Sequence, residues 1–178
     1  MKTKIILLVS VLSFGFCKEK GSSSKELGGG MASVQDQTPV KNIVQIAVGS
    51  KDHTTLVEAL KAAGLVDALA NPGPFTVFAP TNAAFDQVPK DSLQNLLKPE
   101  NKKDLETVLY HHVFVGVLRK EDLEQNYNGK DLVMFDGTQE KVEIKNKEIY
   151  LGGAKVIGDA TASNGMVYIV DKVLLPKK

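Results

Sequence analysis

The sequence predicts an α+β domain over residues 39–178, with helices in its first half and an antiparallel sheet in its last third. Three observations carry this prediction. Apolar residues recur at helical spacing between residues 40 and 111. Residues 141–145 (KVEIK) alternate strictly between apolar and polar. Asn164-Gly165 is the strongest short-range hairpin signal in the chain.

The first half of this domain alternates short helices with one buried strand. Helices are expected over residues 40–48, 54–63, 65–69, 91–97 and 99–111, with Gly64 placed to end the second of them. Residues 71–74 (NPGP) cannot continue a helix, and residues 75–79 (FTVFA) are aromatic and β-branched, which predicts a strand. Apolar residues occupy both the odd and the even positions of this strand, so we expect both of its faces to be buried. Thr81 or Asn82 can cap the short helix that follows Pro80.

The last third of the chain has the two-residue period of strands. Residues 112–118 are β-branched and extended, residues 141–145 and 149–151 flank a turn at Asn146-Lys147, and residues 156–157 and 160–162 keep strand character. Residues 166–175 form the returning strand after Asn164-Gly165. Asp171 interrupts that strand, where its carboxylate can bond to the backbone or to a neighbouring turn.

The first 38 residues read as an export signal followed by a tether. Lys2 and Lys4 precede an apolar run that ends at residue 16, which is shorter than the roughly 20 residues needed to cross a bilayer. Residues 17–38 are rich in Ser and Gly, a composition typical of a flexible linker. Cys17 stands at the junction, as the acylated cysteine of a bacterial lipoprotein does. Phe16 departs from the small residue usual before such a cysteine, and cleavage after Gly15 would instead release a soluble protein.

Composition excludes several function classes. The chain has one cysteine and a net charge of +1, so it holds no internal disulfide and no Cys-rich zinc site, and its charge gives no reason to expect nucleic-acid binding. The side chains of the adjacent His111 and His112 diverge, so they cannot both face one metal. We expect no metal and no cofactor, a structural role for His112, and a solvent-exposed His53. Glu121 and Asp122 are typical helix-start charges.

Three ordered segments resemble the fasciclin (FAS1) domain family. Residues 75–85 (FTVFAPTNAAF) resemble its first signature, residues 112–116 (HVFVG) its central Tyr-His segment, and residues 164–176 (NGMVYIVDKVLLP) its second signature. In the central segment His112 aligns with the family's histidine and His111 with its tyrosine, while Tyr110 lies one place earlier. The resemblance implies a fasciclin-like fold, an antiparallel β-sandwich-like core wedged against several helices.

The resemblance also implies a binding or adhesion module. We expect it to be non-catalytic, because no nucleophile–base pair and no paired carboxylates stand out in the sequence. Its expected ligand is a protein or polysaccharide of the envelope or matrix, and its expected location is the bacterial surface, anchored by a lipid on Cys17. The candidate ligand-binding residues are Tyr110, His111, His112, Thr81 and Asn82. A soluble periplasmic or secreted structural protein, and a hydrolase acting on envelope polymers, are the alternatives.

Overall fold

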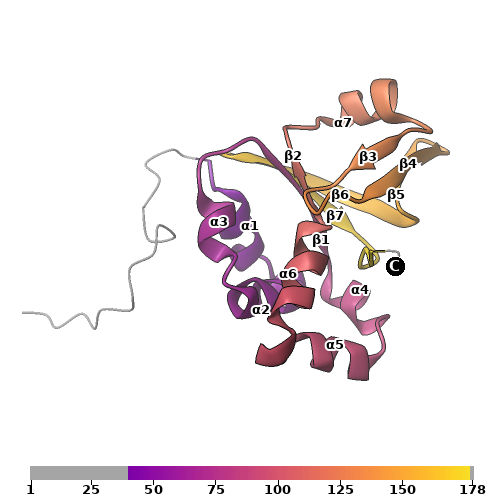
Figure 1. The fold of residues 1–178 in the computed structure, drawn as a ribbon. Helices are drawn as coiled ribbons and strands as arrows, with labels where there is room; N and C mark the ends of the chain where they lie inside the picture. The colour runs from indigo at the N-terminus through magenta and orange to yellow at the C-terminus, as the bar shows by residue number, and fades with distance from the viewer. Residues whose placement is uncertain (1–39, 177–178) are drawn as a thin grey trace, which may run out of the picture.

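A computed structural model describes residues 40–176 of the chain, with most of the helices gathered along one side of a curved sheet (Figure 1). The predicted signal segment 1–16, the tether 17–38 and Cys17 lie outside the described residues. Within the described part, no helix is both long and apolar enough to cross a membrane. Among the described residues, the buried core residues and the strands lie between residues 43 and 174.

The helices follow the predicted order closely. They are α1 (Ile43–Gly49), α2 (Thr54–Ala63), α3 (Val66–Ala70), α4 (Asn82–Asp86), α5 (Lys90–Leu96), α6 (Lys102–Tyr110) and α7 (Lys120–Asp122). Short 3-10 turns at Lys51–His53 and Pro99–Asn101 precede α2 and α6, and a π-helical turn, Leu123–Tyr127, follows α7.

Local capping sets the helix ends. The first helix begins at Ile43 and not at Val40, because Asn42 forms a capping box with Gln45. Gly64 ends α2 in the left-handed conformation, as predicted. The single helix expected over residues 99–111 is instead a 3-10 turn followed by α6.

Seven strands form one sheet in the described residues, in the order β2-β1-β7-β6-β5-β4-β3. They are β1 (Phe75–Pro80), β2 (Val113–Val115), β3 (Asp131–Val133), β4 (Gln139–Lys145), β5 (Glu148–Leu151), β6 (Ala154–Ala162) and β7 (Gly165–Val170). Strand β1 pairs with β7 in parallel, so the sheet is mixed, whereas the sequence predicted an antiparallel one. The other pairs are antiparallel.

The sheet curls until its two edges nearly meet. Just beyond β3, the Phe135 N–H donates to the Val113 carbonyl of β2 at 2.7 Å. This bond joins the two end strands into a near-barrel, consistent with the α+β fold predicted.

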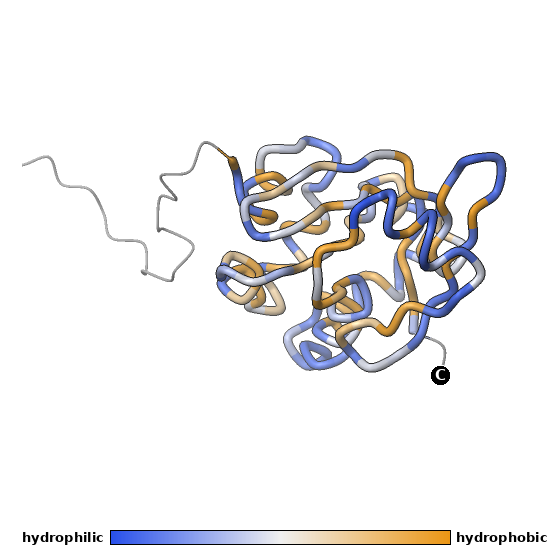
Figure 2. The backbone as a smooth tube through the Cα atoms, turned by 90° about the horizontal axis from the view of Figure 1, so that it is seen from above, coloured by the Kyte–Doolittle hydropathy of each residue, from blue (hydrophilic) through white to orange (hydrophobic). Residues whose placement is uncertain are grey.

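Two apolar cores fill the molecule. One lies between the helices and the outer face of β1 and β7, with Leu56, Leu60, Val77 and Val167 among its members. The other fills the inside of the curled sheet, around Phe78 and Tyr168. Strand β1 contributes to both, so its two faces are buried as predicted. Figure 2 shows the hydrophobic segments running through the interior while hydrophilic loops project outward.

Candidate functional site

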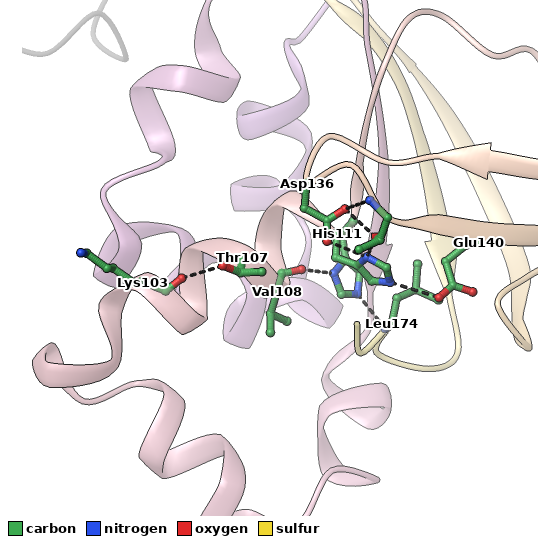
Figure 3. Close-up of polar contacts among 9 residues, drawn as sticks. Lys103, Thr107, Val108, His111, Asp136, Glu140 and Leu174 are labelled. Atoms are coloured by element: carbon green, nitrogen blue, oxygen red, sulfur yellow. Dashed lines mark hydrogen bonds and ion pairs between the residues drawn. The ribbon is translucent and has the colours of Figure 1, made fainter. Parts of the chain in front are cut away.

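His111 lies at the end of α6 and is fully buried between two carboxylates. Its Nδ1 is 2.9 Å from Asp136 Oδ2 and its Nε2 is 3.2 Å from Glu140 Oε1 (Figure 3). The Thr138 hydroxyl contacts His111 Nδ1 and also donates to Asp136 Oδ1 at 2.6 Å. Burial raises the pKa of Asp136, but the hydrogen bonds from Thr138 and the nearby His111 outweigh it and hold that pKa below its usual value. This cluster fastens the end of α6 to the loop and strand beyond β3.

His112 is buried as well, and its hydrogen bonds determine its tautomer. Nδ1 lies 2.7 Å from the Val108 carbonyl oxygen, which can only accept, so Nδ1 carries the proton. Nε2 accepts from the Leu174 N–H at 2.9 Å and therefore has no proton. Burial lowers the pKa of His112 to about 4, so the ring is neutral at physiological pH. The imidazole thus links α6 to the segment after β7, away from any ligand at the surface.

Thr81 and Asn82 also make bonds within the fold. The Thr81 hydroxyl accepts from the Ala84 N–H at 3.2 Å and caps α4. The Asn82 side chain accepts from the Thr55 N–H at 3.0 Å and donates to the Lys51 carbonyl at 3.0 Å. Asn82 thus ties the first signature to the start of α2, while Thr81 acts within α4.

The expectation that His53 is solvent-exposed is wrong. The ring is only 5% exposed, because the 3-10 turn that leads into α2 directs it inward. Its Nδ1 lies 2.8 Å from Ser50 Oγ, and burial lowers its pKa. Among residues 40–176, no group of three or more His, Cys, Asp or Glu side chains is arranged to hold a metal ion.

Whereas His112 lines only two small apolar cavities, of about 20 Å³ each, Tyr110 borders a larger apolar hollow. This hollow, which we call the Tyr110 hollow, has a volume of about 120 Å³. Its walls come from α3, α6, β1, β2 and the loop after β3. The residues that line it are Leu65, Ala68, Leu69, Phe75, Leu109, Tyr110, Val113 and Phe135.

Phe135 forms the outer rim of the Tyr110 hollow and was not among the predicted site residues. Its ring centroid is 4.7 Å from that of Tyr110, and the side chain is 50% exposed. The backbone bond from Phe135 to Val113 holds it there. Val133 and Val115, which flank this bond along β3 and β2, are also about half exposed, at 51% and 54%. A large exposed aromatic beside an apolar depression is typical of a binding surface.

Comparisons with known proteins agree with the fold. The family model described as Fasciclin domain matches residues 51–176. Protein sll1483 of Synechocystis is 39% identical over 135 residues, which cover 75% of this chain and 73% of that protein. The cell surface glycolipoprotein MPB83 of Mycobacterium bovis is 34% identical, with 69% of this chain and 55% of that one covered.

A solved structure shows the same fold at low sequence identity. It is the FAS1 domain pair of the insect cell adhesion molecule Fasciclin I, which covers 76% of this chain and 51% of its own, with a TM-score of 0.67 and 18% identity. At that identity the likeness concerns the fold alone. Since the family model matches most of the chain and a relative is 39% identical over 75% of it, the chain belongs to the fasciclin domain family.

Proposed function

We propose that this chain is a non-catalytic adhesion-type module that binds a protein of the envelope or matrix through the Tyr110 hollow. The observation that carries the proposal is the half-exposed Phe135 at the rim of an otherwise apolar depression. The relatives support it, since one is named a cell surface glycolipoprotein and a protein of the same fold a cell adhesion molecule.

The chemistry of the hollow favours a protein over a polysaccharide. Apart from the Tyr110 hydroxyl, no side chain that lines the hollow can form a hydrogen bond. Most sugar hydroxyls placed there would therefore lose water without gaining a hydrogen bond, at a cost of about 1–3 kcal/mol each. A volume of about 120 Å³ suits one large apolar side chain. The ligand therefore inserts a Leu-, Met- or Phe-like side chain between Tyr110 and Phe135, and the exposed valines of β2 and β3 contact its surroundings.

A photocrosslinking experiment tests this function. The protein carries a benzophenone amino acid at position 135 in living cells, with the same group at the exposed Val48 of α1 as the matched control. We expect a discrete adduct with an envelope protein from position 135 only. Ala68→Trp, which fills the hollow from α3, should abolish the adduct while the melting temperature stays near that of the parent. Equal adducts from both positions, or an adduct that persists in Ala68→Trp, would contradict the proposal.

We also propose that a lipid on Cys17 anchors the module at the cell surface. The proposal rests on the position of this single cysteine, at the end of the apolar run and before the Gly/Ser-rich segment. Radiolabelled palmitate should label the parent and not Cys17→Ser. An unlabelled parent protein recovered without its first 15 residues would instead support cleavage after Gly15 and a soluble product.

A further inference from the structure

Strand β6 has a long edge that no other strand covers. The strand runs for nine residues and pairs with β7 from Val156 to Ala162. On its other side it pairs with β5 only at Ala154 and Lys155. From Ile157 to Ala162, therefore, no strand of the described residues adjoins the side of β6 that faces away from β7. We call this stretch the open edge.

The register shows which backbone groups point out of the open edge. A two-residue loop, Ser163-Asn164, joins Ala162 to its partner Gly165, and the closing pair of such a hairpin exchanges both of its hydrogen bonds. Since bonded and non-bonded pairs alternate along an antiparallel ladder, Ala160 also bonds to β7, while Asp159 and Thr161 do not. The N–H and C=O groups of Asp159 and Thr161 thus point outward, two donors and two acceptors in all.

The space beside the open edge is large enough for another chain. A depression of about 780 Å³ lies along residues 159–166 and is bounded on its far side by Arg119, Lys120 and Glu121. A second depression, of about 360 Å³, opens where β5 diverges from β6 near Ile157. Ile157 itself is 54% exposed.

The pairing of β6 with β7 is irregular between Val156 and Gly158, but the rest of the open edge lacks several features that keep strand edges from pairing. Proteins usually protect such edges with Lys, Pro or a covering segment. Between residues 157 and 162 there is no Pro and no Lys, and Asp159 is the only charged residue. The larger depression is bordered by two cations, Arg119 and Lys120, and two carboxylates, Glu121 and Asp159. This balance gives no advantage to a strongly charged partner and does not repel a second copy of the same chain.

We propose that two copies of this chain associate by antiparallel pairing of their open edges, about a two-fold axis at Ala160. In this register Asp159 of each copy lies opposite Thr161 of the other, so their outward backbone groups form four hydrogen bonds. Each carboxylate also meets a hydroxyl, and Ile157 lies opposite Ser163 of the second copy, in the smaller depression. A register with the two Asp159 side chains directly opposite would place like charges together, which is unfavourable. The association is independent of the Tyr110 hollow.

Sedimentation equilibrium of the full chain over a wide concentration range tests the pairing. We expect a reversible monomer–dimer equilibrium in the parent. Thr161→Lys places an ammonium opposite Asp159 twice per dimer and should lower the dissociation constant several-fold. Thr161→Asp places two carboxylates together twice and should raise it several-fold.

A backbone change and a control complete the test. Thr161→Pro removes an outward N–H that β7 does not use, so the domain should fold but remain monomeric. Circular dichroism checks the fold of each variant. Ala68→Trp, in the Tyr110 hollow, should leave the dimer unchanged, so failure of one proposal does not imply failure of the other. A parent that is monomeric at all concentrations would overturn the inference. The same holds if Thr161→Lys and Thr161→Asp shift the equilibrium in the same direction.

Discussion

The hydrogen bonds of His112 predict that acid destabilises the fold through this one ring. Nε2 must stay unprotonated to accept from the Leu174 N–H, and burial lowers the pKa of the ring from 6.5 to about 4. In the unfolded chain the ring takes up a proton near its ordinary pKa of 6.5. Between pH 6.5 and about 4 the unfolded state therefore binds more protons, so the free energy of unfolding falls as the pH falls through this window.

These two pKa values set the size of the effect. Protonation of His112 lowers the free energy of unfolding by about 2 kcal/mol between pH 7.5 and pH 5.0. Below pH 4 the total loss approaches about 3 kcal/mol. The lowered pKa of His53 acts in the same direction, again because of burial. His111 and Asp136 are the titratable groups whose charges act on His112, and both remain in the comparison variant described next.

The assay compares the parent with His112→Gln, whose amide keeps an acceptor for Leu174 but cannot titrate. Urea unfolding measures the free energy of unfolding at pH 7.5 and 5.0. From the higher to the lower pH, this free energy should fall by about 2 kcal/mol more in the parent than in the variant. Nuclear magnetic resonance of the ring should show the Nδ1-protonated neutral tautomer at pH 6. Equal losses in both proteins, or a His112 that titrates at or above 6.5, would refute this account.

Three further predictions concern stability. Thr81→Ala removes the cap of α4 and should cost about 1 kcal/mol in urea unfolding, while Thr81→Ser should cost much less. Gly152→Ala should cost about 1–3 kcal/mol or more, because its φ is +56° and a Cβ there overlaps the Glu140 carboxylate; at Gly153, where a Cβ meets open space, thermal melting should show a smaller loss. Gly165→Ala should prevent folding, as judged by circular dichroism, because its Cβ would overlap the Phe75 carbonyl of the paired strand.

Local patterns predicted the helices and the hairpins well, because they depend on residues close in sequence. Gly64 ends α2 where expected, and Asn146 and Lys147 both take positive φ in the β4–β5 turn. The hairpin at Asn164-Gly165 is confirmed too, but its loop is Ser163-Asn164 and Gly165 is already in β7. Asp171 accepts from the Lys155 N–H at 2.8 Å, the backbone bond predicted for it.

The position of Asn164 shows what such patterns miss. Its side chain accepts from the Ile43 N–H at 3.0 Å and donates to the carbonyls of Leu69 and Asn71, at 2.8 and 3.0 Å. The residue thus closes a hairpin and also fastens α1 and α3 to the sheet. Turn statistics predict the hairpin role but not the others, because those partners lie about a hundred residues earlier in the chain. The parallel pairing of β1 with β7 was missed for the same reason.

The two histidines show why a motif alone did not locate the candidate site. Their place in the central segment made both of them candidate ligand contacts, although a structural role was expected for His112. His111 in fact binds Asp136 and Glu140, 25 and 29 residues later, and both rings are buried. A buried imidazole whose two nitrogens are both hydrogen-bonded holds its bonding partners in place. Here His111 binds Asp136, the residue after Phe135, and so helps hold that aromatic beside Tyr110. Of the three residues predicted in this region, Tyr110 alone lines the Tyr110 hollow, while His112 joins α6 to the segment after β7.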